Sequence, residues 1–423
     1  MLRVATDNDE SERTMRDGGI QAVAIASGSG EDNIVSRHIP KSERYGAASL
    51  SKPVFSYLVL KLIGSDGFEL DTKLHTILSF KDFCETVGKE LFGKEFNIIW
   101  DDSAENIARA EQFTPAMILS HQTGLPIGYK SESGRPLQFD FEPGQGFAYS
   151  GIHLMYLQAC LEIKFEKKLE KLAETYVFKP ARMNNSSFDT PVANAANSLH
   201  TTAEDYVRFC LHMLHDPDPH VQEAFTCKVS MRDDPWAVRE NIPIPTLNHL
   251  AWGYGWGLEL DDDGRVISAF HTGDMNEWQA GVKLDLISES VTVFLSKSTY
   301  GNGHLLQDQV FGRSYALDYF FDKFKFARTV DELKDDWRQC PSCGERKATV
   351  QSENKRMGGT ADILVMVSSA PAESAKHQLQ VATSAPKVVI PEPSAQTSPA
   401  SPFEEAGKCE ARADEPPIGA KRR

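Results

Sequence analysis

The chain has 423 residues, of which 41% are hydrophobic and 25% are charged, and its formal net charge at pH 7 is −15. These values are typical of a globular protein, and the acidic balance argues against nucleic acid or an anionic membrane as a partner, because either requires a basic surface. No apolar run is long enough to span a bilayer, and the acidic segment from Met1 to Gly19 lacks the apolar stretch of a secretory signal. We therefore expect a cytoplasmic protein.

Two strands are predicted near the start, Ile20–Ala26 and Asn33–Ile39, which form a hairpin around a Gly-containing turn. The chain then enters a segment whose apolar residues have helical spacing, which predicts a buried helix. These apolar residues are Val54, Phe55, Leu58, Val59, Leu62 and Ile63. Ser49 is expected to be the N-cap of this helix, with Pro53 in its first turn.

Ser49 and Lys52 are three residues apart, so a helix that begins here places both side chains on one face. A serine hydroxyl becomes a nucleophile when a nearby base takes its proton, and burial lowers the pKa of a lysine towards that role. The same Ser-x-x-Lys spacing recurs at Ser352 and Ser384, but in polar surroundings without an apolar helix. The alternative is that Ser49 only caps the helix and Lys52 is a surface cation.

The middle of the chain is predicted to be mostly helical. Residues 80–113 combine charges and aromatic residues without a clear period, and we expect helix and loop there. Further helices are predicted over Ala116–Gln122, Ile152–Leu161, Lys167–Val177 and Tyr206–Leu214. The last of these follows a capping box in which Thr202 precedes Asp205 by three residues.

Strands return in the last third of the globular part. They are predicted over Trp252–Leu260, Val266–Gly273, Trp278–Asp285 and Ser290–Ser296, and a final helix over Leu305–Phe326. A strand pair, then helices, then a strand meander with a helix indicates an α+β fold with an antiparallel sheet.

Composition changes beyond about Trp337, where prolines recur and Phe403 is the only aromatic residue. Such a segment cannot bury enough apolar surface to offset its chain entropy. We therefore predict a flexible N-terminus at residues 1–18, a globular domain at 19–328, and a Pro-rich, disordered tail at 329–423. The tail is a possible binding site for a protein partner.

The seven cysteines are odd in number and scattered, which does not indicate a disulfide framework. Four of them are interpreted as interior residues of a reduced compartment: Cys84, Cys160, Cys210 and Cys227. Cys340 and Cys343 form half of a zinc-binding pattern, and Cys409 is the only cysteine beyond them. We predict no metal site and no cofactor.

Three short motifs follow one another along the chain: Ser49-x-x-Lys52, Tyr149-Ser150-Gly151 and His271-Thr272-Gly273. Two more lie between them, at residues 119–126 and 201–205. With these motifs the chain resembles the β-lactamase-related serine hydrolases, which include class C β-lactamases, D,D-peptidases, D-aminopeptidases and carboxylesterases. The resemblance covers roughly residues 19–326. It implies an antiparallel sheet flanked by helices, a mostly helical inserted lobe, and an active site in the cleft between them.

The resemblance also implies a role for each motif. Ser49 would form an acyl-enzyme. Tyr149 beside Lys52 would act as, or share, the general base for Ser49, with its phenolate favoured by the neighbouring cation, and would later protonate the leaving group. Which of the two holds the proton is left open. The backbone N–H groups of Ser49 and Asp274 would form the oxyanion hole.

The remaining site residues follow from the same resemblance. His271, Thr272 and Gly273 would form the opposite wall, although His271 could instead only shape the strand edge. The substrate pocket is assigned to Ser150, Gly151 and Trp278, the last of which is alternatively a core residue of the sheet. His121, in residues 119–126, is expected to bond backbone and is not assigned to catalysis.

Two departures from the family pattern bear on the substrate. Gly151 stands where β-lactamases and D,D-peptidases usually have an asparagine that bonds both the lysine and the substrate amide. His271, mostly neutral at pH 7, stands where lactamases have a lysine. These differences favour a small-molecule ester or amide. The alternatives are β-lactamase, D,D-peptidase or D-aminopeptidase activity, or a catalytically weak scaffold that binds a partner through its tail.

Overall fold

The structure is a computed structural model. It describes residues 9–30, 33–39, 44–93, 96–127, 136–188, 190–235, 237, 241–324 and 326–332. The Cys340–Cys343 pair and almost all of the predicted tail lie outside these residues. In the described part of the chain, no helix is both long enough and apolar enough to cross a membrane.

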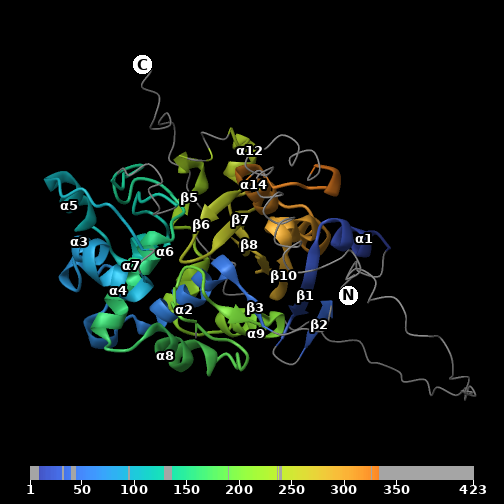
Figure 1. The fold of residues 1–423 in the computed structure, drawn as a ribbon, viewed down its shortest axis with the longest axis horizontal. Coiled ribbons are helices and arrows are strands. Elements are labelled where there is room, and N and C mark those ends of the chain that lie inside the picture. Colours follow the sequence, from blue (N-terminus) through green and yellow to red (C-terminus); the bar gives the residue numbers. More distant parts are fainter. Residues whose placement is uncertain are drawn as a thin grey trace, which may run out of the picture. The chain divides into compact units, whose positions relative to one another are not determined.

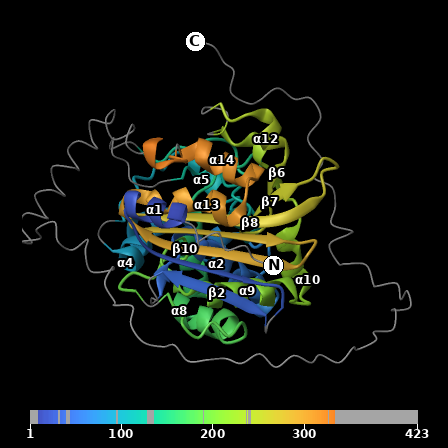
Figure 2. The ribbon, with the colours of Figure 1, turned by 90° about the vertical axis from the view of Figure 1, so that its right-hand side faces the viewer.

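An antiparallel sheet of eight strands organises the described residues (Figures 1 and 2), in the order β2-β1-β10-β9-β8-β7-β6-β5. Strand β1 pairs with β10, so that Ala24 lies opposite Leu295 and the N-terminal hairpin joins the C-terminal meander. The strands are β1 (Ile20–Gly28), β2 (Ile34–Ile39), β5 (Val229–Ser230), β6 (Leu250–Trp252), β7 (Gly257–Leu260), β8 (Val266–Met275), β9 (Trp278–Asp285) and β10 (Ser290–Ser298). A second, two-stranded pair joins β3 (Tyr45–Gly46) to β4 (His200–Thr201). The predicted α+β class is confirmed.

Helices cover both faces of the sheet (Figure 2). One face carries α1 (Asp9–Asp17), α13 (Gln307–Phe311) and α14 (Tyr315–Phe324), and the other carries α2 (Ser51–Leu62) and α9 (Ala203–Leu214). Helix α9 packs on β1 and β10. Its N-cap is the predicted one, because Thr202 Oγ1 accepts a hydrogen bond of 3.2 Å from the backbone N–H of Asp205.

The segment between β2 and β5 forms the helical lobe, which lies beside the sheet (Figure 1). Its α-helices, besides α2 and α9, are α3 (Phe80–Asp82), α4 (Gly88–Phe92), α5 (Ala104–Ala110), α6 (Pro115–Leu119), α7 (Ile152–Lys164), α8 (Leu169–Ala173) and α10 (Pro219–Gln222). The other helical turns among the described residues are η1 (Ala48–Leu50), η2 (Ser65–Gly67), η3 (Leu74–Thr76), η4 (Phe83–Val87), η5 (Glu174–Phe178), η6 (Glu223–Phe225), η7 (Met231–Asp233) and η8 (Thr299–Leu306). Helix α12 (Ile244–Asn248) precedes β6.

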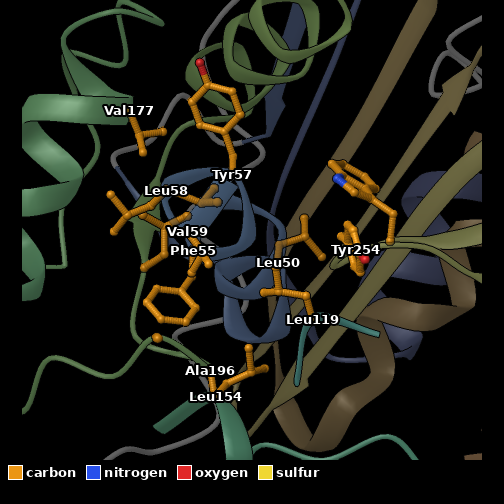
Figure 3. Packing of buried hydrophobic residues seen from close by; sticks show 14 of the residues in the cluster. Leu50, Phe55, Tyr57, Leu58, Val59, Leu119, Leu154, Val177, Ala196 and Tyr254 are labelled. Carbon is orange, nitrogen blue, oxygen red and sulfur yellow. The ribbon is translucent and has the colours of Figure 1, made fainter. Parts of the chain in front are cut away.

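Helix α2 is buried over nearly its whole length, and apolar side chains of the lobe and the sheet surround it (Figure 3). The predicted N-cap is wrong: the helix begins at Ser51, after the single turn η1 that contains Ser49. The position before the helix is Leu50, which makes no side-chain cap. Ser49 is therefore free to direct its hydroxyl to another partner.

Two predicted elements are interrupted by glycines. The strand predicted over Trp252–Leu260 is divided into β6 and β7, because Gly255 has a φ of +80° and turns the chain against α2. A Cβ atom at Gly255 would lie 2.1 Å from Ser56 Oγ. The predicted last helix is likewise divided into η8, α13 and α14, with Gly312 at a φ of +69° between α13 and α14.

The cysteines of the described residues follow the prediction in part. Cys84, Cys160 and Cys210 are buried and free. Cys227 is half-buried and disulfide-bonded, so its interpretation as an unpaired interior residue is wrong.

Candidate active site

Ser49 lies where helix α2 meets strand β8. Its neighbour Ala48 has a φ of +46°, a conformation that costs energy for a residue with a Cβ atom. On the strand side, a Cβ atom at Gly273 would lie 2.7 Å from the carbonyl oxygen of Ala47 and 3.1 Å from the backbone nitrogen of Ser49. Only glycine at this position lets β8 approach the serine backbone so closely.

Lys52 is buried beside Ser49, with 4% of its surface exposed. Its Nζ donates hydrogen bonds of 2.9 Å to Ser49 Oγ and 2.9 Å to the carbonyl oxygen of Ala196. Both acceptors are uncharged, so neither compensates for the lost solvation of the ammonium group. Burial therefore lowers the pKa of Lys52 to about 7.

Tyr149 completes the cluster from the loop that precedes α7. Its ring lies 4.8 Å from Lys52 Nζ, and a hydrogen bond joins its side chain to that of Ser49. Burial raises the pKa of Tyr149 well above its usual value, and the hydrogen bond to Ser49 opposes this only in part. This direction is opposite to the expectation that a neighbouring cation favours the phenolate, because burial disfavours the charged form of the phenol.

His271 of strand β8 lies beside these groups as an uncharged side chain. It is 1% exposed, and its ring lies 6.0 Å from that of Tyr149. Burial, reinforced by the charge of Lys52, lowers the pKa of His271 to about 3. Its Nδ1–H donates to the carbonyl oxygen of Thr272 at 2.7 Å, which leaves Nε2 as an acceptor.

Asp274 follows Gly273 on β8, and its exposed side chain is bound by β9. Its Oδ1 accepts a hydrogen bond of 3.1 Å from Gln279 Nε2 and lies 3.7 Å from Nε2 of the buried His304. These contacts hold the strand end whose backbone N–H is the second oxyanion donor expected from the sequence.

The three residues assigned to the substrate pocket differ in their surroundings. Gly151 lies near Ala196, the residue whose carbonyl oxygen binds Lys52, because a Cβ atom on Gly151 would be 3.6 Å from Ala196 Cβ. Ser150 is fully buried, and its Oγ has no partner among the described residues. Trp278 instead packs on the β3–β4 pair, with its ring 2.8 Å from a Cβ atom placed at Gly46 and 6.1 Å from the ring of Tyr45.

Two site residues have no sequence signal that identifies them. Ala196 contributes only a backbone carbonyl, which any residue type supplies. Trp252 is buried, with its ring 5.8 Å from Tyr149 and 5.6 Å from His271, so it packs behind both. Its sequence neighbourhood predicts only a strand.

The histidines around Lys52 do not make a metal centre. Among the described residues, no group of three or more histidine, cysteine, aspartate or glutamate side chains is arranged to hold a metal ion. The arrangement is instead an amine of lowered pKa, a hydroxyl and a phenol in contact, and these groups suit proton transfer and acylation.

An antiparallel sheet, an added helical lobe, and a serine, lysine and tyrosine clustered where they meet define a serine hydrolase of the β-lactamase type. The family model described as Beta-lactamase matches residues 11–316. The chain belongs to this family, and the resemblance stated from its motifs is confirmed. Comparison with curated proteins finds no match.

Several solved structures have a similar fold. The octameric penicillin-binding protein homologue from Pyrococcus abyssi has a TM-score of 0.55 and 14% identity, covering 77% of this chain and 81% of that one. The D-stereospecific amidohydrolase from Streptomyces sp. has a TM-score of 0.52 and 14% identity, over 73% of this chain and 100% of that one. The penicillin binding protein from Bacillus halodurans has a TM-score of 0.51 and 16% identity, over 71% and 99%. At these identities the likeness establishes the fold.

Proposed function

We propose that this protein is a serine hydrolase that forms an acyl-enzyme on Ser49 and acts on an ester or a small amide. The observation that carries the proposal is the 2.9 Å contact between Lys52 Nζ and Ser49 Oγ, made by an amine whose burial lowers its pKa to about 7. Such an amine accepts a proton at neutral pH, which an exposed lysine does not.

In the proposed reaction, the neutral Lys52 amine takes the Ser49 proton while Oγ bonds to the substrate carbonyl carbon. The oxyanion accepts hydrogen bonds from the backbone N–H groups of Ser49 and Asp274, and the loss of one such donor typically costs about 3 kcal/mol. When the bond to the leaving group breaks, Tyr149 donates its proton and is reprotonated from Lys52. Water then cleaves the acyl-enzyme: Lys52 receives a proton of the water, relayed through Tyr149, as the water oxygen bonds to the acyl carbon, and this proton passes to Ser49 Oγ when the ester bond breaks.

This scheme assigns the base, which the sequence left open between two residues. The raised pKa of Tyr149 keeps it a phenol at neutral pH, so it can donate a proton but is a poor base. The lowered pKa of Lys52 makes its amine available in the neutral form near pH 7, so it can accept a proton. Lys52 is therefore proposed as the general base and Tyr149 as the general acid.

The preference for a neutral ester or small amide rests on two side chains. His271 is neutral in its buried position, so it supplies no cation for the carboxylate of a β-lactam or a peptide C-terminus. Gly151 supplies no side-chain amide to bond the substrate. Neither feature hinders an uncharged acyl group.

A fluorophosphonate probe tests the proposal, because it labels an activated serine. We expect labelling of the wild type and its loss in Ser49→Ala, and a wild type that does not label would favour a non-catalytic scaffold. A series of p-nitrophenyl esters of rising chain length then defines the acyl group. Acylation of Ser49 by a penicillin as fast as by a simple aryl ester would overturn the substrate preference.

A further inference from the structure

His121 occupies a strained, buried position directly beneath the Tyr149 loop. It follows helix α6 with a φ of +56°, and 1% of its surface is exposed. A residue with a Cβ atom rarely adopts this conformation, which persists where the surrounding contacts demand it. The contacts of His121 therefore indicate which local arrangement requires the strained backbone.

Two backbone hydrogen bonds tie His121 to the residues on either side of Tyr149. The backbone N–H of Ala148 donates to the carbonyl oxygen of His121 at 2.9 Å. The backbone N–H of Ser150 donates to His121 Nδ1 at 3.0 Å. The main chain of Tyr149 is thus held at both ends by one residue.

The imidazole also contacts the tyrosine ring itself. The rings of His121 and Tyr149 are stacked, with centroids 4.5 Å apart and planes at 26°. The ring of His153 lies 4.7 Å from that of His121, and its Nδ1 lies 2.8 Å from Thr123 Oγ1. The rings of Tyr149, His121 and His153 are thus in contact in that order, and the last of them is bound to the hydroxyl group of Thr123.

The protonation state of His121 is defined by these contacts. Because Nδ1 accepts a hydrogen bond from a backbone N–H, the ring proton is on Nε2. Burial, followed by the charge of His153 and that of Lys52, lowers the pKa of His121 well below its usual value. The ring therefore stays neutral and keeps its acceptor over the range in which the enzyme is proposed to act.

We propose that His121 is a positioning residue for the reaction: it holds the Tyr149 hydroxyl against Ser49 through one side-chain acceptor and one stacked ring. This inference rests on the proposed function of Tyr149 as proton donor. It does not make His121 a catalytic residue, since the ring acts through Tyr149.

Two substitutions separate the acceptor from the ring. His121→Asn places Oδ1 near the position of Nδ1 and tolerates the positive φ, but removes the stacked ring. His121→Phe keeps a ring and removes the acceptor. Misplacing a catalytic group by about 1 Å costs on the order of a hundredfold in rate. We expect kcat for an aryl ester to fall about tenfold in His121→Asn and about a hundredfold in His121→Phe, with KM unchanged within about twofold.

A pH profile distinguishes positioning from a loss of folded protein. When Tyr149 leaves its place, water reaches Lys52 and its pKa rises, so the midpoint of kcat against pH moves in the alkaline direction. A purely structural role reduces the concentration of active sites, counted by fluorophosphonate titration, without moving that midpoint.

His249→Asn is the matched control. The His249 ring is also stacked on a tyrosine, Tyr315, at 4.1 Å and 3°, and its Nδ1 also makes a backbone contact, 3.0 Å from the carbonyl oxygen of Leu260. His249 lies between α12 and β6, and we expect kcat and the pH midpoint of His249→Asn to equal those of the wild type.

Each outcome of these measurements either supports or overturns the positioning role of His121. Wild-type kcat and midpoint in folded His121 variants would overturn this inference alone, as would a rise in KM without a fall in kcat. If His121→Phe does not fold, the pH midpoint of His121→Asn decides by itself. A wild type that does not react with the probe would overturn the proposed function, and this inference with it.

Discussion

At the scale of single residues, the burial of Lys52 is the property on which the chemistry depends. A lysine in water has a pKa of about 10.4 and is protonated at neutral pH. Here the amine is buried against two neutral oxygens, and its pKa falls to about 7. The residue is a base because of its surroundings and not because of its type.

The first prediction concerns pH. Since the neutral form of Lys52 is the active one, the acylation rate should rise about tenfold per pH unit below pH 7 and level off above it. Rates of p-nitrophenyl ester cleavage from pH 5 to 9 measure this. Lys52→Arg should lose about a thousandfold at all pH values, since a guanidinium cannot be deprotonated. A midpoint near pH 10 would contradict the assignment of the base.

A second prediction concerns Gly151. Its φ of −91° suits any residue, and a Cβ atom there would meet Ala196 Cβ at an ordinary contact distance of 3.6 Å. Gly151→Asn should therefore fold, and its amide can reach the neighbourhood of Lys52. We expect penicillin acylation to increase about fivefold relative to ester cleavage, since one hydrogen bond to the uncharged substrate amide contributes roughly 1 kcal/mol. Gly151→Ala is the control and should show no such increase.

At the scale of elements, close backbone approach decides where strands and helices meet. Gly255 separates β6 from β7 and lets this turn lie against Ser56 of α2. Its backbone N–H also donates to the carbonyl oxygen of Leu119, the last residue of α6, at 2.8 Å. Gly273 serves the same purpose where β8 passes Ser49. Sequence periodicity does not contain this information, because it reports the residues of one element and not the elements packed on it.

The third prediction tests this packing. Gly255→Ala brings a Cβ atom to 2.1 Å from Ser56 Oγ in addition to its unfavourable φ. We expect a loss of about 3 kcal/mol or more in the free energy of unfolding, combining backbone strain with overpacking. Gly64→Ala is a matched control, because Gly64 has a φ of +82° with no atom within 4 Å of its Cβ position. It should cost only about 1 kcal/mol, measured by urea unfolding. An equal loss of unfolding free energy in the two variants would show that the contact with α2 adds nothing to the cost of Gly255→Ala.

At the scale of the whole molecule, the sheet and the lobe together enclose several neutral histidines. His153 is fully buried, and burial, reinforced by the charge of Lys52, lowers its pKa to about 3. His271 behaves in the same way. In the unfolded chain a histidine has a pKa of about 6.5. At a pH between the folded-state and unfolded-state pKa values, the unfolded state binds more protons than the folded state. The free energy of unfolding therefore falls as the pH falls below about 6.5.

The fourth prediction follows from this difference. Each buried histidine contributes a slope of about 1.4 kcal/mol per pH unit between roughly pH 6 and pH 4. In His153→Asn one such contribution is absent, so the free energy of unfolding should depend on pH less steeply by that amount. Urea unfolding at pH 6, 5 and 4 measures the difference.

Local sequence determined the elements and their order. The apolar spacing from Val54 to Ile63 predicted α2, and the alternation from Trp278 to Asp285 predicted β9 with its observed bounds. The α+β class followed from the order of these elements. Such features depend on residues close to one another in the chain, which is why the sequence contains them.

Only the tertiary structure decided how the candidate site is built. The contact of Lys52 with Ala196, the stacking of His121 on Tyr149 and the approach of Gly273 to Ser49 join residues far apart in the sequence. The lowered pKa of Lys52 and the neutral His271 arise from the same enclosure. Residue type and spacing were enough to identify the reacting groups. Their protonation and position depend on the fold, because desolvation depends on every group packed around a side chain.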